Sequence, residues 1–128
     1  MTTIKFSRQR ESIKNYLYHT TSHPTAAKIY DDLRIEYPNI SLGTVYRNLN
    51  FLVENGDIIK ISCDDGSDHY DGNVNPHYHF MCKKCHQVVD LDMPPLSQID
   101  ILANANFGGE IEGHFTYFYG TCEKCKNK

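Results

Sequence analysis

Two Cys-x2-Cys knuckles constrain this chain more than any other feature. Cys82 and Cys85 form the first knuckle, and Cys122 and Cys125 form the second, with 36 residues between the two. Four thiolates in this pattern fit the closed tetrahedral coordination of structural zinc. Disulfides or a redox dithiol pair are the alternatives, but two knuckles so far apart are better explained by one shared Zn2+ ion. The spacing therefore predicts a zinc site that ties a hairpin to the last residues of the chain.

The first part of the chain predicts three helices followed by a β-hairpin. The expected helices are residues 7–19, 26–37 and 42–55. Their expected N-caps are Ser7, Thr25 and Ser41, and Gly56 is the glycine expected after the third helix. The expected strands are residues 58–62 and 68–71, around a turn at 64–66. This order is that of a winged helix-turn-helix, whose third helix enters the major groove of DNA.

The outer face of the third expected helix carries the candidate DNA contacts. They are Thr44, Tyr46, Arg47 and Asn48. The Arg47 guanidinium suits a phosphate or a guanine edge, and Tyr46 suits a thymine methyl or a phosphate. Further candidate phosphate contacts are Arg8, Arg10 and Lys60. A solvated helix face is the alternative for all of these side chains.

The charge is distributed unevenly along the chain. Residues 1–62 carry eight Lys or Arg against six Asp or Glu, a net charge of +2, whereas residues 63–128 carry five against ten, a net charge of -5. A mildly basic first half and an acidic second half indicate separate tasks. With an overall net charge of -3, the chain is not a polycation.

The second part predicts a smaller unit joined by a linker. Residues 1–72 are the expected DNA-binding domain, 73–76 the linker and 77–128 a small α/β domain. The elements expected in it are strands at 78–82, 87–91 and 110–121 and a helix at 95–105. A unit of this size has a poor surface-to-volume ratio and exposed sheet edges, and dimerisation through it would solve both problems. The expected fold class is α+β.

A second set of metal ligands differs in chemistry from the cysteines. Its members are His23, Asp71, His77, His79 and Asp90. Three imidazoles and two carboxylates are too many ligands for tetrahedral structural zinc and suit Fe2+ or Mn2+. The set draws on the DNA-binding half, the linker region and the second half, so that filling it would fix the angle between two domains. A polar cluster without metal, a metalloenzyme site and a zinc-stabilised interaction module without a DNA role are the alternatives.

Several spaced motifs together resemble the ferric uptake regulator family over nearly the whole length. They are His23-Pro24-Thr25-Ala26, Ser41-Leu42-Gly43-Thr44-Val45-Tyr46-Arg47-Asn48-Leu49, His77-Tyr78-His79, Asp90 and the two knuckles. The resemblance implies a homodimeric winged-helix repressor that binds a palindromic double-stranded DNA operator. It also supports the five His and Asp residues as a regulatory metal site, position by position.

Within that family the chain looks most like the peroxide-responsive repressors. Both carboxylate positions, Asp71 and Asp90, are aspartate here, where iron-uptake regulators more often have glutamate. The resemblance implies that peroxide oxidises a histidine ligand when Fe2+ is bound, and the matching positions are His23 and His77. The oxidised site then releases DNA, which is sensing and not enzymatic turnover. A regulator of iron or other metal uptake is the alternative.

Four residues receive no role in this prediction. Cys63 is expected to be an unpaired thiol, His69 and His86 to face solvent, and His114 to be a histidine on the surface of the sheet. Pro76 and Tyr78 stand where many family members have a His-x-Asp pair that completes a further metal site with the counterpart of His114. The chain carries no signal peptide or membrane-spanning run, so a cytoplasmic location is expected.

Overall fold

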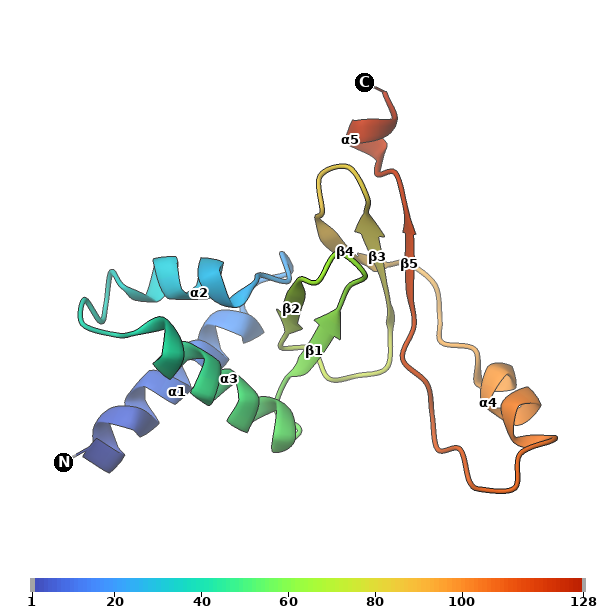
Figure 1. Ribbon diagram of the computed structural model, residues 1–128, viewed down its shortest axis with the longest axis horizontal. Helices are drawn as coiled ribbons and strands as arrows, with labels where there is room; N and C mark the ends of the chain where they lie inside the picture. The colour runs from blue at the N-terminus through green and yellow to red at the C-terminus, as the bar shows by residue number, and fades with distance from the viewer. Residues whose placement is uncertain (1, 128) are drawn as a thin grey trace. The chain divides into compact units, whose positions relative to one another are not determined.

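The computed structural model describes residues 2–127, which form two compact units. The first unit ends at Asn75 and the second begins at Pro76. Figure 1 follows the elements of both units along the chain. None of the helices described in residues 2–127 is long and apolar enough to cross a membrane.

The first unit consists of three helices and a two-stranded antiparallel sheet. Its elements are α1 (Thr2–Tyr18), α2 (Ala26–Leu33), α3 (Leu42–Glu54), β1 (Ile59–Ser62) and β2 (Asp68–Asp71). The register pairs Ile59 with Asp71 and Ser62 with Asp68. Between the strands the Gly66 N–H donates to the Cys63 carbonyl at 3.1 Å, and Gly66 has φ 85°. The predicted hairpin wing is therefore confirmed.

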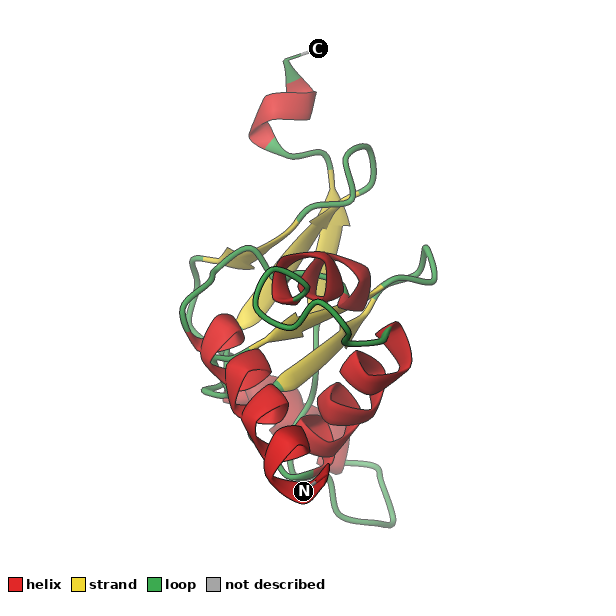
Figure 2. Ribbon diagram, turned by 90° about the vertical axis from the view of Figure 1, so that its left-hand side faces the viewer, coloured by secondary structure: helices red, strands yellow, loops and turns green. Residues whose placement is uncertain are grey.

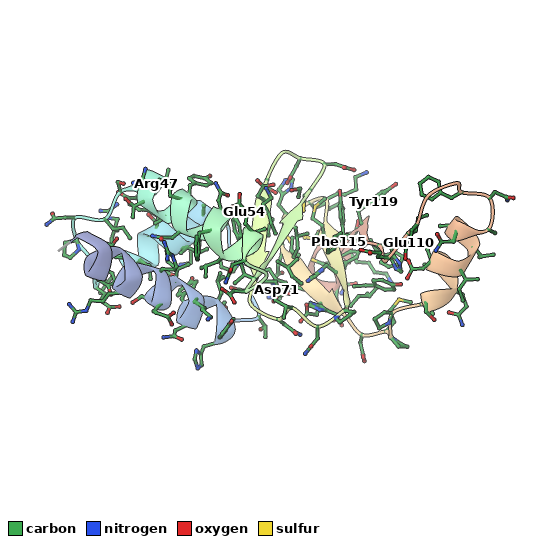
Figure 3. The ribbon with its side chains drawn as sticks, turned by 90° about the horizontal axis from the view of Figure 1, so that it is seen from below. Arg47, Glu54, Asp71, Glu110, Phe115 and Tyr119 are labelled. Carbon is green, nitrogen blue, oxygen red and sulfur yellow. The ribbon has the colours of Figure 1, made fainter. Side chains whose placement is uncertain are left out.

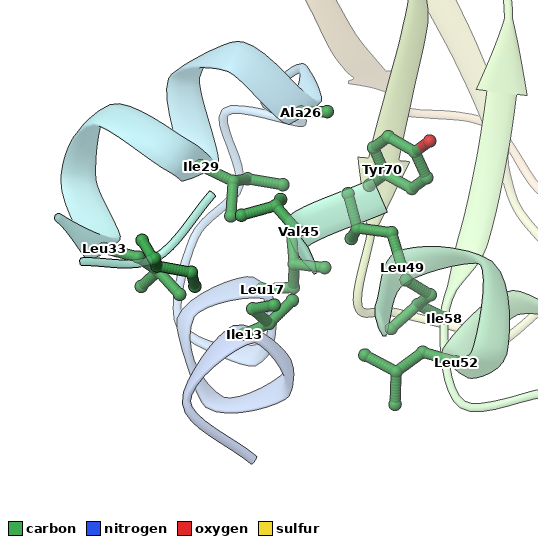
Figure 4. Close-up of a cluster of buried hydrophobic side chains, with 11 residues drawn as sticks. Ile13, Leu17, Ala26, Ile29, Leu33, Val45, Leu49, Leu52, Ile58 and Tyr70 are labelled. Atoms are coloured by element: carbon green, nitrogen blue, oxygen red, sulfur yellow. The ribbon is translucent and has the colours of Figure 1, made fainter. Parts of the chain in front are cut away.

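The inner faces of the three helices enclose the core of the first unit. Figure 4 shows the side chains that meet there. They are Ile13 and Leu17 of α1, Ala26, Ile29 and Leu33 of α2, Val45, Leu49 and Leu52 of α3, and Ile40, Ile58 and Tyr70. Because Tyr70 belongs to β2, the core also fixes the hairpin against the helices. The buried Val45, Leu49 and Leu52 of α3 follow the helical period that the sequence pattern predicted.

The ends of α2 and α3 follow the predicted capping signals. Thr25 Oγ1 accepts a hydrogen bond from the Lys28 N–H at 3.3 Å, and Ser41 Oγ accepts one from the Thr44 N–H at 3.1 Å. After α3, Gly56 adopts φ 80° and its N–H donates to the Val53 carbonyl at 3.1 Å. A left-handed glycine at this position lets the chain leave the helix and start the hairpin.

Two helix boundaries of the first unit differ from the prediction by four or more residues. Helix α1 begins at Thr2, so Ser7 lies inside it and is not its N-cap. No Pro or Gly lies upstream to stop the helix from extending that far. Helix α2 ends at Leu33 and not at Tyr37, because the Glu36 and Tyr37 N–H groups both donate to the Leu33 carbonyl in a turn.

The second unit is a three-stranded sheet with two short helices and long loops (Figure 2). Its elements are β3 (Tyr78–Cys82), β4 (Val88–Leu91), α4 (Ser97–Asn104), β5 (Tyr117–Gly120) and α5 (Glu123–Lys126). The strand order is β4-β3-β5, with β4 antiparallel and β5 parallel to β3. Central strand β3 therefore carries both neighbours.

The last strand is shorter than predicted, and α5 was not predicted. Strand β5 covers Tyr117–Gly120 instead of 110–121 because it pairs with β3, which has only five residues. Alternating polarity in residues 110–116 is not enough to make a strand without a partner.

Helix α4 buries none of its residues, and Ile101 and Leu102 are 67% and 73% exposed.

Candidate metal centres and nucleic-acid interface

The four knuckle cysteines come together at one end of the sheet of the second unit. Cys82 ends β3, Cys85 lies in the turn after it, Cys122 precedes α5 and Cys125 lies within α5. All four Sγ atoms lie within 4.8 Å of one another. The Cys85 and Cys122 Sγ atoms are 3.8 Å apart, and Zn–S bonds of about 2.3 Å in a tetrahedron require an edge of about 3.8 Å. The spacing therefore fits a single zinc ion bound by four thiolates.

Backbone hydrogen bonds prepare the sulfur of Cys82 for a metal. The Cys85 and Cys122 N–H groups donate to Cys82 Sγ at 3.5 and 3.4 Å. Led by the Cys85 N–H, these donors lower the pKa of Cys82 to about 5. Hydrogen bonding to the Cys122 thiol, together with burial, raises the pKa of Cys125 to about 12. A cation bound by all four sulfurs would release the proton that the Cys125 thiol otherwise holds.

Two ligands of the predicted regulatory site meet inside the first unit. His23 lies in the loop before α2 and Asp71 ends β2, where Figure 3 labels it. His23 Nδ1 lies 3.6 Å from Asp71 Oδ2, and the residues are only 1% and 2% exposed. Ionisable side chains this deeply buried are normally paired or bound to a metal. The structure thus brings together a nitrogen and a carboxylate oxygen from residues 48 positions apart in the chain.

The other three ligands meet inside the second unit. The hairpin register places Asp90 of β4 directly opposite His79 of β3. Asp90 Oδ1 lies 3.1 Å from His77 Nε2 and 3.5 Å from His79 Nε2. The two imidazole rings lie side by side, with centroids 4.4 Å apart. Two nitrogen donors and a carboxylate oxygen converge here, as the alternation of the strand predicts.

His69 was expected to face solvent, and this prediction is wrong. Its side chain is buried, and Nδ1 lies 2.7 Å from the His23 carbonyl oxygen. Its Nε2 lies 3.2 Å from Ser67 Oγ. The alternation of the wing hairpin could have indicated an inward side chain at His69, because Asp71, two residues on, is inward as well. The exposed position predicted for His86 agrees with the structure.

His114 is not a surface histidine of the sheet. It precedes β5 and is half-buried, with Nδ1 2.7 Å from Asp100 Oδ1 of α4. Its Nε2 lies 2.8 Å from the Tyr78 hydroxyl, which also accepts a hydrogen bond from the Leu96 N–H at 2.9 Å. A hydrogen-bonded chain of Asp100, His114 and Tyr78 therefore joins α4 to β3.

Cys63 lies apart from the cysteine cluster. It is a free, buried thiol in the wing turn of the first unit. Burial, reinforced by the neighbouring carboxylates of Asp65, Asp64 and Asp68, raises its pKa. A thiol held in its protonated form is a poor metal ligand and a poor nucleophile.

Two of the four predicted DNA contacts on α3 are buried instead of exposed. Thr44 is 9% and Asn48 4% exposed. These positions adjoin the apolar stripe of α3, and they pair internally: Arg47 Nη2 donates to Thr44 Oγ1 at 3.0 Å, and Arg10 Nε donates to Asn48 Oδ1 at 3.3 Å. Tyr46 and Arg47 are exposed, and Arg47 lies on the surface of α3 in Figure 3.

The three remaining basic candidates have different surroundings. Arg8 of α1 and Lys60 of β1 are exposed. The guanidinium of Arg10 lies 3.8 Å from the centroid of the Phe51 ring. Since Arg10 also donates to Asn48, it joins α1 to α3 and is half-buried.

The fold and the two kinds of ligand cluster define a winged-helix protein of the metal-binding class. A family model described as "Ferric uptake regulator family" matches residues 1–119. The chain belongs to the ferric uptake regulator family, although the matched range ends before the second knuckle.

Named relatives place the chain near one branch of that family. It is 35% identical over 125 residues to the peroxide-responsive repressor PerR of Staphylococcus epidermidis, covering 98% of this chain and 83% of the relative. The PerR of Staphylococcus aureus strain Mu50 is also 35% identical, with 98% and 84% covered. The crystal structure of the Campylobacter jejuni peroxide stress regulator is 30% identical with a TM-score of 0.81, over 95% of this chain and 92% of that one.

Proposed function

We propose that this protein is a metal-dependent, DNA-binding transcriptional repressor that senses peroxide. The observation that carries the proposal is the 35% identity to peroxide-responsive repressors along 98% of the chain. The ligand pairs support it, because each unit holds histidine and aspartate side chains at metal-binding distances from one another. The relatives are named as repressors, which are regulators and not catalysts of a metabolic reaction.

The regulatory site comprises His23, Asp71, His77, His79 and Asp90 and holds Fe2+ or Mn2+. Imidazole and carboxylate donors suit these ions, and all five side chains are of that kind. Because the first two ligands belong to one unit and the last three to the other, a bound ion fixes the angle between the units. In a homodimer this angle sets the spacing of the two α3 helices on a palindromic operator.

Bound Fe2+ supplies the redox chemistry by which peroxide adds oxygen to a histidine ring. His23 and His77 are the residues that undergo this change. An oxidised ring is a weaker ligand, so the site loses its ion and the angle between the units is no longer fixed. The site is consumed by its signal and does not turn over.

The four cysteines hold structural Zn2+, which keeps the second unit folded. Dimerisation through this unit is supported by its exposed apolar side chains, which include Ile101 and Leu102 of α4 and the 93% exposed Phe115. Large apolar surfaces of this kind are characteristic of interfaces. A soluble regulator of DNA acts in the cytoplasm.

The surface that meets DNA centres on the exposed side of α3. Tyr46 and Arg47 contact the major groove, and Arg8 and Lys60 contact phosphates. Asn48 and Arg10 support this surface from beneath, because their hydrogen bond holds α3 against α1. Thr44 accepts a hydrogen bond from the Arg47 guanidinium and so orients that side chain. This arrangement amends the prediction that all seven side chains touch DNA.

The decisive experiment is peptide mass mapping after exposure to dilute peroxide, with Fe2+ in one sample and Mn2+ in the other. We expect a one-oxygen gain on the peptides that contain His23 or His77, in the iron sample alone. DNA retention in a gel-shift assay should fall in the same sample. Metal-dependent DNA binding without any oxygen gain would instead identify a metal-uptake regulator.

A further inference from the structure

The backbone around His23 is unusual for a residue with a side chain. His23 has φ 50°, in the left-handed region that favours glycine, and it directly precedes Pro24. A β-carbon makes this conformation costly, so surrounding contacts must hold it in place. Because His23 is a ligand of the proposed regulatory site, whatever holds its backbone also sets where its imidazole lies.

Strand β2 supplies those contacts. The Tyr70 N–H donates to the Pro24 carbonyl at 3.0 Å, and Thr25 forms an antiparallel bridge with His69. Between these backbone contacts, His69 Nδ1 lies 2.7 Å from the His23 carbonyl oxygen, in a buried setting. A carbonyl oxygen can only accept, so Nδ1 carries the proton and donates it. Two residues after His69 on β2 lies Asp71, the proposed metal ligand beside His23.

On its other side the His69 ring lies against the wing turn, with Nε2 3.2 Å from Ser67 Oγ. The single proton of the Ser67 hydroxyl is donated to Asp65 Oδ1 at 2.6 Å, so it is not available to Nε2. The hydrogen bond that holds the ring is therefore the one from Nδ1–H to the His23 carbonyl.

We propose that His69 is a positioning residue for the regulatory metal site, which holds the strained His23 backbone through its Nδ1–H so that the His23 imidazole faces Asp71. The inference rests on the proposed function, because it concerns the Fe2+ or Mn2+ site assigned there. Partners that orient metal ligands commonly change metal affinity by about 10- to 100-fold when they are lost.

Two isosteric variants separate the donor from the bulk of the ring. In His69→Asn the amide nitrogen takes the place of Nδ1 and retains the donor to the His23 carbonyl. In His69→Gln the amide takes the place of Nε2, so the reach toward Ser67 remains and the Nδ1 donor is lost. Both variants are polar and smaller than the ring, which makes each the control for the other.

The first measurement is Mn2+ affinity of the zinc-loaded dimer, read from the loss of the electron paramagnetic resonance signal of free Mn2+. We expect His69→Gln to raise the Mn2+ dissociation constant about 10-fold or more, and His69→Asn to stay within about 3-fold of the wild type. Zinc content should remain at one ion per chain in both variants. Equal affinity in all three proteins, or an equal loss in both variants, would overturn the inference.

The second measurement needs no regulatory metal. Amide exchange of residues 22–25 in the zinc-loaded, Mn2+-free protein should be faster in His69→Gln and unchanged in His69→Asn. Unchanged exchange in His69→Gln would overturn the positioning role alone. A wild-type protein that binds no Mn2+ beyond its zinc would overturn the proposed function, and the inference with it, so the two failures are distinguishable.

Discussion

A tyrosine and an aspartate link α1 to α2 through one strong hydrogen bond. The Tyr16 hydroxyl donates to Asp32 Oδ2 at 2.5 Å, and Lys28 Nζ donates to Asp32 Oδ1 at 3.1 Å. The bond from Tyr16 is the main reason that the pKa of Asp32 is lowered. Burial, reinforced by the carboxylate, raises the pKa of Tyr16 above its ordinary range. Both shifts favour the neutral phenol beside the ionised carboxylate.

Replacing Tyr16 by phenylalanine should therefore destabilise the protein in a pH-dependent way. A lowered carboxyl pKa gives stability that is present above the ordinary value of about 3.9 and is lost as pH falls through the folded value. The raised phenol pKa gives stability that is present up to about pH 10 and is lost as pH rises further. We expect Tyr16→Phe to cost about 1 kcal/mol of unfolding free energy at pH 7 and to cost progressively less below about pH 4.

Urea denaturation followed by far-UV circular dichroism at several pH values measures this difference. Tyr18→Phe is the control, because the Tyr18 hydroxyl donates to a backbone carbonyl, that of Asp57, at 3.4 Å. The cost of Tyr18→Phe in unfolding free energy should be the same at pH 3 and at pH 7. An equal cost of Tyr16→Phe at pH 3 and pH 7 would exclude the linkage to Asp32.

Gly72 lies where the end of β2 touches α1. A β-carbon on Gly72 would lie 2.7 Å from the backbone carbonyl carbon and oxygen of Leu17 and 2.7 Å from Cδ1 of Tyr18. Backbone atoms cannot move aside as a side chain can, so Gly72→Ala should cost about 2 kcal/mol or more in unfolding free energy. Since Gly72 follows Asp71, we also expect weaker Mn2+ binding.

Gly43→Ala is the matched control in the same unit. Its β-carbon would meet the flexible Arg47 guanidinium at 3.4 Å and Ser41 Oγ at 3.8 Å. Alanine also favours a helical backbone, so the melting temperature should stay level or rise slightly. Equal melting temperatures for Gly72→Ala and the wild type would mean that β2 can shift away from α1 without cost.

Single residues show where prediction from the sequence stops. The inward stripe of α3 was predictable from its period, yet the buried Asn48 is paired with Arg10, which belongs to another helix. His69 and His114 each find their partners 46 and 14 positions away. The sequence around each histidine does not indicate these distant partners, because such contacts depend on the tertiary fold.

At the scale of elements, a hydrogen-bonded chain positions α4. The Tyr78 hydroxyl accepts from the Leu96 N–H at 2.9 Å, directly before α4, and lies 2.8 Å from His114 Nε2. His114 Nδ1 in turn lies 2.7 Å from Asp100 within α4. Because α4 buries none of its own residues, these hydrogen bonds are its main attachment to the sheet in the protomer.

Tyr78→Phe should loosen α4 while leaving the sheet intact. We expect amide exchange of Leu96 and of Ser97–Asn104 to become about 5- to 10-fold faster, which corresponds to about 1 kcal/mol of local stability. Exchange in β3 and the zinc content should not change. Tyr119→Phe removes an equally polar hydroxyl from a 63% exposed side chain and serves as the control. Slow exchange of α4 in Tyr78→Phe would instead assign its attachment to the dimer interface that we propose.

The order of elements was predictable, whereas lengths and pairings were less so. Strong local signals placed three helices, the wing and the first knuckle hairpin, because caps, turns and periods are local properties. Strand β5 was overestimated because its length is set by β3, and α5 was missed because a single turn leaves no period to detect. The cysteine cluster was predictable from spacing alone, since metal coordination restricts which residues can serve.

Across the whole molecule, the two units draw their stability from different sources. The first unit has a continuous apolar core built from all three helices. In the second unit the buried apolar side chains are Tyr78, Met81, Cys82, Val88 and Cys125, and two of these belong to the cysteine cluster. Zinc bound by four thiolates is worth on the order of 10 kcal/mol, as much as the total stability of a typical domain. The second unit should therefore depend on its metal, and the first should not.

Two single substitutions test this division of labour. Cys82→Ser should lose zinc, the folded second unit and the dimer, measured by zinc content, near-UV circular dichroism and sedimentation velocity. His77→Ala should retain one zinc per chain and the dimer, but lose Mn2+-dependent DNA retention. Cys63→Ser is the control for removing a buried thiol, since Cys63 lies outside the cluster and its raised pKa disfavours metal binding. If Cys82→Ser and His77→Ala unfolded to the same extent, the division into a structural and a regulatory metal site would be wrong.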